Sequence, residues 1–263
     1  MLPNTLYIYI TDSSLYFVKQ AKGRDSNLQT AHCDINPGMP FAAVIDEFLA
    51  ERQSMLEGAD KVRVIVDSPS VLIPLAEFSE DTFREYYKYC IPSDYECRIF
   101  CDTLPVANAM LVFSVAENVY SIITDRFEKP YFCSSIAAIS SNFMRKSSTQ
   151  VAPKRILCAL REEAIDIVAA EAGKLLLVNS FSVRATSDIL YYTLATASKL
   201  GISAETDTFF IAGEEQAAKV AMEEFRKVVR NVRPYNLFEE SDNSIALPKE
   251  PVPFAIQNFL VES

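Results

Sequence analysis

LYIYI at residues 6–10 and ILCAL at residues 156–160 are apolar runs that each open the same series of predicted elements. In the first copy the later elements are strands at 15–18 and 28–35, an amphipathic helix at 41–56 and a strand at 62–66. In the second copy they are strands at 164–169 and 175–181, a helix at 188–200 and a strand at 208–212. Both copies therefore have the order strand, strand, strand, helix, strand, and this repeat predicts two α/β domains built on one plan.

A polar run at residues 146–150 separates the two copies. We expect a first domain at 1–148, a second at 152–233 and a C-terminal segment at 234–263. Residues 71–145 alternate between predicted helices and strands, and we expect them to extend the first sheet. In the second copy, Ser187 is the expected N-cap of the helix, and Gly201 is the expected left-handed residue that ends it.

The C-terminal segment begins acidic and proline-bearing and then becomes apolar. Its large apolar side chains are Phe254, Ile256, Phe259 and Leu260. Burying such a side chain contributes roughly 1.5–3 kcal/mol. We therefore expect the segment to dock, either on the rest of the chain or on a partner.

The composition excludes several classes of function. A net charge of −10 disfavours nucleic acid, whose binding depends on cationic contacts to phosphate. The apolar runs fall short of the roughly 18–20 residues that a membrane-spanning helix requires, and we expect a cytoplasmic protein with no membrane span.

Six scattered cysteines without a CxxC pair are typical of buried thiols, and Cys97 with Cys101 lacks the second ligand pair of a zinc site. With His32 as the single histidine, no Ser/His/Asp arrangement can be assembled. We therefore predict no catalytic residues and no metal site.

The duplicated βββαβ pattern resembles the actin-like ATPase fold, which is related to the ribonuclease H-like fold. More narrowly, the chain is similar to a bacterial family of uncharacterised proteins, a domain of unknown function, believed to share that fold. The resemblance covers nearly the whole chain in the order of elements. It implies two domains with an interdomain cleft, and it implies that the C-terminal segment docks on the first domain.

Members of the actin-like superfamily that hydrolyse ATP hold the phosphates between two turns with an Asp-x-Gly-Ser/Thr-like pattern. The first turn here is Asp12-Ser13-Ser14-Leu15, in which Ser14 stands at the glycine position. The second turn is Arg161-Glu162-Glu163, which would bring two carboxylates to a triphosphate. The Gly-Gly that contacts adenosine in the superfamily is reduced to Ala212-Gly213-Glu214. The sequence therefore predicts degenerate nucleotide motifs.

The residues that the resemblance assigns to a vestigial nucleotide cleft are Asp12, Ser13, Ser14, Asp67 and Gly213. Three of them have a structural alternative. Asp12 is then a carboxylate that hydrogen-bonds its own turn, Asp67 belongs to a plain loop after a strand, and Gly213 forms a strand-to-helix turn. Tyrosines form another candidate set, because tyrosine is favoured at interfaces. They are Tyr86, Tyr87, Tyr89, Tyr191 and Tyr192, for which half-buried packing is the alternative.

Three functions are compatible with these observations. The first is a non-catalytic scaffold or partner-binding module that has no cofactor and binds an unidentified protein. The second is a divergent ATP-binding protein or weak ATPase that holds ATP and Mg²⁺ in the cleft. The third is a metal-dependent nuclease, which requires convergent carboxylates. Asp12, Asp67 and Asp166 are not expected to converge in this way, and we favour the first hypothesis.

Overall fold

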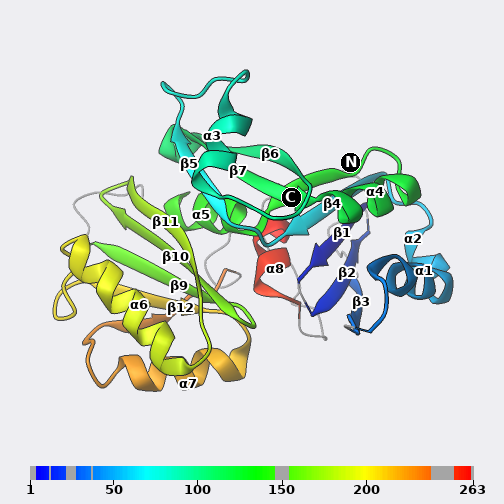
Figure 1. Ribbon diagram of the computed structural model, residues 1–263. Helices are drawn as coiled ribbons and strands as arrows, with labels where there is room; N and C mark the ends of the chain where they lie inside the picture. The colour runs from blue at the N-terminus through cyan, green and yellow to red at the C-terminus, as the bar shows by residue number, and fades with distance from the viewer. Residues whose placement is uncertain are drawn as a thin grey trace.

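The chain forms two α/β domains and a small inserted sheet in the computed structural model (Figure 1). The structure describes residues 4–11, 13–21, 28–36, 38–145, 154–237 and 252–261. Asp12 lies outside these described residues. Within the part of the chain that is described, no helix is long and apolar enough to cross a membrane.

The first domain contains a five-stranded sheet in the order β3-β2-β1-β4-β8. Its strands are β1 (Thr5–Ile10), β2 (Ser14–Gln20), β3 (Leu28–Asp34), β4 (Lys61–Val66) and β8 (Tyr131–Ser134). β1 is antiparallel to β2 and parallel to β4, which is in turn parallel to β8. The central position of β1 explains its fully buried, apolar sequence.

The second domain repeats this topology in the order β11-β10-β9-β12-β13. Its strands are β9 (Arg155–Leu160), β10 (Ala164–Glu171), β11 (Lys174–Ser182), β12 (Thr208–Ala212) and β13 (Val232–Pro234). β9 is antiparallel to β10 and parallel to β12, as β1 is to β2 and β4. The two central strands are therefore equivalent, and the predicted duplication is confirmed.

The outer face of each sheet is covered by helices. In the first domain these are α1 (Phe41–Glu51), the short α2 (Gln53–Leu56) and α4 (Glu117–Arg126). In the second they are α6 (Thr186–Lys199) and α7 (Glu215–Phe225). Leu6, Ile8 and Ile10 of β1 pack in the core that contains α1, whereas Tyr7 and Tyr9 pack in a different core on the opposite face. This alternation follows from the two-residue period of a strand.

The start of α6 differs from the prediction. The helix begins at Thr186 with Ala185 as N-cap, rather than with Ser187. The Asp188 carboxylate accepts hydrogen bonds from the N–H groups of Arg184 and Ala185, at 2.9 and 3.1 Å, so an acidic side chain inside the first turn performs the capping. Gly201 does adopt the predicted left-handed conformation, with φ of 64°.

A three-stranded antiparallel sheet is inserted between β4 and α4, in the order β5-β7-β6. The inserted segment contains, in chain order, β5 (Ser70–Pro74), α3 (Phe83–Cys90), β6 (Cys97–Leu104), the 3-10 turn η1 (Pro105–Ala107) and β7 (Ala109–Ala116). The expectation that residues 71–145 extend the first sheet is therefore wrong for these strands and correct for β8 alone. The strands pair with one another because β5 turns away from the sheet after β4 (Figure 1).

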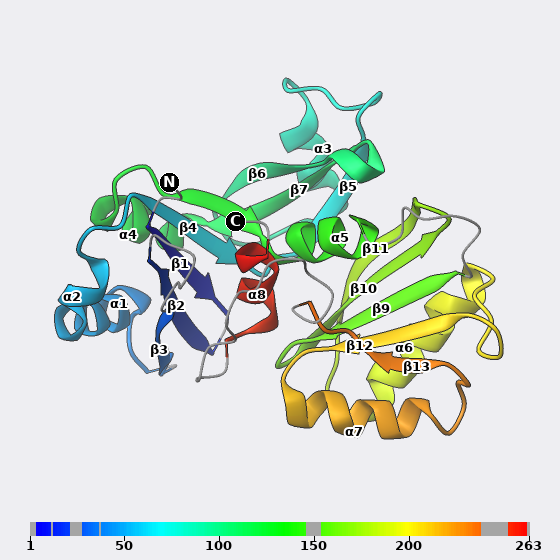
Figure 2. The same cartoon turned by 180° about the vertical axis from the view of Figure 1, so that it is seen from behind.

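Two helices lie between the domains, and each packs against the sheet of the other domain (Figure 2). α5 (Ser135–Arg145) follows β8 of the first domain, and its Phe143 packs with Leu157 and Val168 of the second. α8 (Phe254–Leu260) follows the second domain in the chain, and its Phe259 packs with residues of β1 and β4. The four large apolar residues of the C-terminal segment thus lie at the interface between the domains.

The two crossing helices share a short sequence as well as a position. α5 contains Asn142-Phe143 and α8 contains Asn258-Phe259. The Asn142 amide donates to the backbone oxygen of Asn258 at 2.9 Å and to its side-chain oxygen at 3.1 Å. Both asparagines are buried, so this polar contact sets the register of two helices that are otherwise apolar where they meet.

Replacing Phe259 with alanine is predicted to lower the free energy of unfolding by about 3–5 kcal/mol, the usual cost of deleting a buried phenylalanine side chain. The measurement is urea unfolding followed by circular dichroism. Val220→Ala is the control, because Val220 is 42% exposed on α7 and its loss should cost less than about 0.5 kcal/mol. Equal stability of the two variants would show that α8 does not hold the domains together.

Candidate functional site

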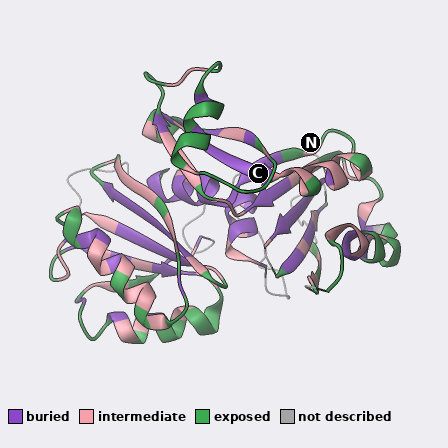
Figure 3. Cartoon of the chain, viewed as in Figure 1, coloured by how far each residue is buried: buried purple, intermediate pink, exposed green. Residues whose placement is uncertain are grey.

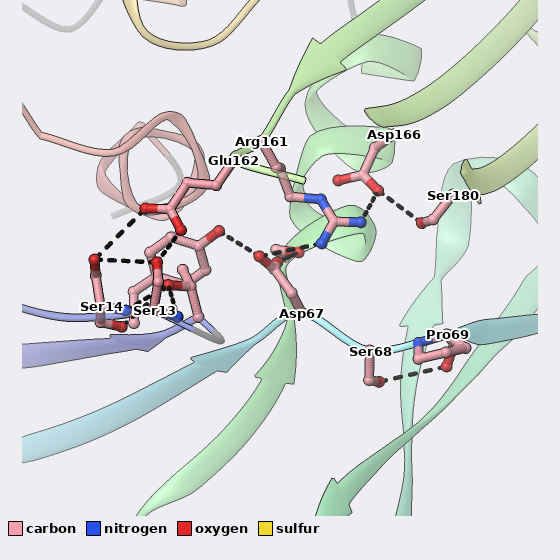
Figure 4. A network of polar contacts seen from close by, with 12 residues as sticks. Ser13, Ser14, Asp67, Ser68, Pro69, Arg161, Glu162, Asp166 and Ser180 are labelled. Carbon is pink, nitrogen blue, oxygen red and sulfur yellow. Dashed lines mark hydrogen bonds and ion pairs between the residues drawn. The ribbon is translucent and has the colours of Figure 1, made fainter. Parts of the chain in front are cut away.

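Two turns, one from each domain, meet at the ends of the central strands (Figure 4). The turn after β1 carries Ser13 and Ser14, and the turn after β9 carries Arg161 and Glu162. The Ser13 hydroxyl donates to one oxygen of the Glu162 carboxylate, and the Ser14 hydroxyl lies 3.5 Å from the other. The two predicted phosphate turns therefore contact each other directly.

In the first turn, a side chain binds part of the backbone. The hydroxyl of Thr11 accepts from the N–H groups of Ser13 and Ser14, at 3.3 and 2.9 Å. These N–H groups are the donors that a phosphate would need, and here a threonine hydroxyl already satisfies them. Ser14, which stands at the glycine position of the superfamily pattern, is buried.

Asp67 follows β4 and forms an ion pair with the second domain. Its carboxylate accepts a hydrogen bond from the Tyr9 hydroxyl at 2.5 Å and another from the Ser135 hydroxyl at the start of α5. The Arg161 guanidinium of the second domain lies 3.2 Å from the same carboxylate. Burial, together with the neighbouring Asp67, raises the pKa of Tyr9 well above its ordinary value, so Tyr9 acts as a hydrogen-bond donor.

Arg161 binds a second carboxylate, that of Asp166 on β10, at 2.8 Å. The Ser180 hydroxyl of β11 donates to the same oxygen at 2.6 Å. Burial opposes the charged form of Arg161, but the attraction of Asp166 and Asp67 is stronger and raises its pKa. Burial likewise raises the pKa of Asp166, against the effect of Arg161. The guanidinium therefore favours the ionised form of this buried carboxyl, whereas burial and the neighbouring Asp67 oppose it.

Two atoms of this cluster are buried without a hydrogen-bond partner, namely Nε of Arg161 and Oδ2 of Asp166. The residues present do not fit a magnesium nucleotide. The one guanidinium at the turns is held by two carboxylates, and the Glu162 carboxylate adds a third negative group where phosphates would lie. Among the described residues, no group of three Asp, Glu, His or Cys side chains is placed to hold a metal ion.

Gly213 follows β12 and passes close to the end of β9. Its φ is +133°, and a Cβ at this position would lie 2.8 Å from Cβ of Leu160 and 3.0 Å from its carbonyl oxygen. Glycine is therefore required here by packing and backbone conformation. Because Leu160 immediately precedes Arg161, this contact also fixes the start of the second turn.

Sequence reasoning identified part of this cluster. Ser13, Ser14 and Asp67 lie in it, and Asp166 is linked to Asp67 because both carboxylates contact Arg161. The partners Tyr9, Ser135 and Ser180 were missed. The signal that could have indicated the site is the charge of Asp166 within the apolar strand AIDIVAA at residues 164–170.

A second buried carboxylate, Asp102 of β6, joins the inserted sheet to the start of α5. It accepts from the N–H of Ser134 at 2.7 Å and from the Tyr131 hydroxyl at 3.2 Å. Burial raises the pKa of Asp102 to about 6, although the bonds from Ser134 and Tyr131 and the charge of Arg63 lower it. Asp102 thus helps to position the helix whose first residue, Ser135, contacts Asp67.

Comparison with solved structures identifies the fold. A Bacteroides thetaiotaomicron protein with an actin-like ATPase fold and unknown function matches 99% of this chain and 96% of its own, with 20% identity and a TM-score of 0.83. A structure of the PilM–PilN type IV pilus biogenesis complex matches over 90% of this chain and 89% of its own, with 14% identity and a TM-score of 0.58. The predicted actin-like fold is confirmed.

The chain belongs to the family of proteins of unknown function DUF3822, whose pattern matches residues 3–232. This confirms the predicted relationship to a domain of unknown function. No curated protein matches the sequence.

Replacing Arg161 with alanine is predicted to lower the free energy of unfolding by about 3–5 kcal/mol, because removing one partner of a buried ion pair leaves uncompensated charge. The measurement is urea unfolding at neutral pH. Lys219→Ala is the control, since Lys219 forms an exposed 2.6 Å ion pair with Glu215 whose loss should cost less than about 1 kcal/mol. A similar small loss in both variants would contradict a structural role for the cluster.

Stability should also depend on pH through Asp102. Since its folded-state pKa is raised from 3.8 to about 6, the folded state binds this proton more tightly than the unfolded state. Its stabilising contribution is complete below about pH 4 and is lost as the pH rises to about 6.

The isosteric variant Asp102→Asn lacks this titration. Between these pH values the wild type should therefore lose up to about 3 kcal/mol relative to the variant. The measurement is urea unfolding across the pH range, with Asp125→Asn at an exposed position on α4 as the matched control. Parallel profiles for the wild type and Asp102→Asn would contradict the prediction.

Proposed function

We propose that this protein is a non-catalytic actin-like scaffold that binds a protein partner while its two domains are held together at the phosphate turns. The observation that carries the proposal is the position of Arg161, which contacts Asp67 across the interface and Asp166 within its own domain. This side chain and Glu162 lie at the turns that the resemblance to actin-like ATPases assigns to phosphate, which supports the proposal.

Electrostatics support this proposal. A phosphate between the turns would face Glu162, and two unit charges at about 4 Å repel by roughly 4 kcal/mol at an effective dielectric constant of about 20. Binding would also separate the Ser13 and Ser14 hydroxyls from Glu162 and compete for the guanidinium. No residue of these turns that the structure describes compensates for these losses, which favours degenerate nucleotide motifs over functional ones.

One observation favours the alternative of a divergent ATP-binding protein. Arginine binds phosphate well, and Nε of Arg161 is buried without a partner. If the domains separate, the guanidinium leaves Asp67 and presents this donor to the opening. The alternative therefore requires an open form of the protein in which the Arg161–Asp67 contact is broken.

We place this protein in the cytosol, where free thiols persist, because all six of its cysteines are unpaired. Binding to a partner is consistent with the use of the same fold in the PilM–PilN complex. Fold alone does not define a partner, so any partner must be recognised through surfaces of this chain.

Purified protein is predicted to show no ATP hydrolysis above a control without enzyme, and no rise in melting temperature with Mg-ATP. The reason is the closed, carboxylate-lined contact between the turns. The thermal-shift measurement is sensitive, since a ligand at 100 times its dissociation constant stabilises by about 2.7 kcal/mol.

Two variants make the nucleotide test decisive. Turnover that disappears in Asp12→Ala would show that the cleft is catalytic. A melting-temperature rise with Mg-ATP that disappears in Arg161→Gln would support the alternative, an opening ATP-binding cleft. Either result would overturn the scaffold proposal.

A further inference from the structure

The inserted sheet carries a projecting segment at residues 75–96 that contains α3, which we name the α3 lobe (Figure 3). Phe83 and Tyr87 are buried and anchor α3 on the sheet, and the Tyr87 hydroxyl donates to the backbone oxygen of Pro69 at 2.7 Å. The rest of the helix faces away from the body of the protein. The lobe is therefore anchored on the inserted sheet and has an exposed surface.

Three tyrosines of the α3 lobe are largely exposed. Tyr86, Tyr89 and Tyr95 are 52%, 87% and 57% exposed. Tyr86 and Tyr89 are three residues apart on α3, so they lie on the same face of the helix. Exposed aromatic rings are typical of protein interfaces, where tyrosine is enriched.

The surface beside these rings is hollowed on both sides of α3. A hollow of about 80 Å³ is lined by Ile73, Phe83 and Tyr86, among others. A broader, shallower hollow of about 670 Å³ includes Lys88, Tyr95 and Glu117 in its lining. Tyr86 and Tyr95 thus each border a recess that side chains of a partner can enter.

The charge of the α3 lobe indicates which partner chemistry would complement it. The lobe carries six exposed acidic residues and two exposed basic ones, a net charge of −4. The acidic residues are Glu77, Glu80, Asp81, Glu85, Asp94 and Glu96. Arginine complements both features, because its guanidinium pairs with carboxylates and stacks on tyrosine rings.

We infer that the α3 lobe binds an arginine-rich segment of a partner protein, with guanidinium groups placed over Tyr86 and Tyr89 and paired with Glu80 and Glu85. This inference rests on the proposed scaffold function and names the chemistry of its partner. A second copy of the chain is disfavoured as occupant, since two lobes of the same negative charge repel each other.

The test uses the full chain and a fluorescently labelled short peptide of alternating arginine and glycine, with binding followed by fluorescence anisotropy at physiological salt. We expect saturable binding that weakens by about tenfold or more in the double variant Tyr86→Ala/Tyr89→Ala, as for loss of interface hot spots. The charge variant Glu80→Gln/Glu85→Gln should weaken it as well, and a lysine peptide should bind less tightly than the arginine peptide.

Matched variants separate a specific site from general attraction to an acidic protein. Tyr191→Ala removes an exposed tyrosine from α6, and Glu205→Gln/Glu223→Gln removes two exposed charges from the second domain. Both should bind the peptide as the wild type does. Equal weakening in control and lobe variants, or no binding by the wild type, would overturn the inference.

Sedimentation of the same proteins tests the other occupant. A wild-type dimer that dissociates in Tyr86→Ala/Tyr89→Ala would assign the lobe to a second copy of the chain and overturn the inference. The peptide test and the nucleotide test are independent of each other. ATP binding at the turns would contradict the proposed function without affecting the inference about the lobe. Absence of peptide binding would overturn that inference without affecting the closed contact between the turns.

Discussion

The exchange of α5 and α8 between the domains is the constraint on which the rest of the structure depends. Each helix covers the inner face of the other domain's sheet, and the two contact each other through Asn142 and Asn258. Apolar burial supplies the attraction, whereas the asparagine contact determines how the helices align. Because each domain's inner core is completed by the other, the two sheets are held at one relative position, and the turns after β1 and β9 meet there.

The polar cluster at these turns follows from that fixed position. One guanidinium that is paired with two carboxylates is stable in a partly buried site only if the three groups keep their relative positions, because desolvation of the charges is costly. The crossing helices maintain these positions, and α5 also contributes Ser135 to Asp67. The contacts of the cluster therefore form only when the two domains are in this relative position. The cluster contributes more to the definition of one closed arrangement than to net stability.

The sequence predicted the duplicated fold well and the site only in part, for physical reasons. Period-two and helical patterns are local, so the strands, α1 and α6 could be located to within a few residues. The inserted sheet was misassigned because strand partners are set by the direction of the chain after β4, which no local pattern records. Likewise, Arg161 could be read as part of a turn, but its contact with Asp67 depends on the packing of α5 and α8. The shared Asn-Phe of these helices was the available signal, and two residues are too few to recognise without the fold.

The described parts of the two domains differ mainly in the segment between β4 and α4. In the second domain, β12 leads through Gly213 directly into α7, whereas in the first domain β4 leads through Asp67 into the inserted sheet. Duplication alone would produce two equivalent surfaces, so a surface without a counterpart must arise from such an insertion. The insertion also contacts the end of β8, directly before α5, through the hydrogen bond from the Ser134 N–H to Asp102. A partner bound at the α3 lobe is therefore connected, through one sheet and one helix N-terminus, to the residues that hold the domains together.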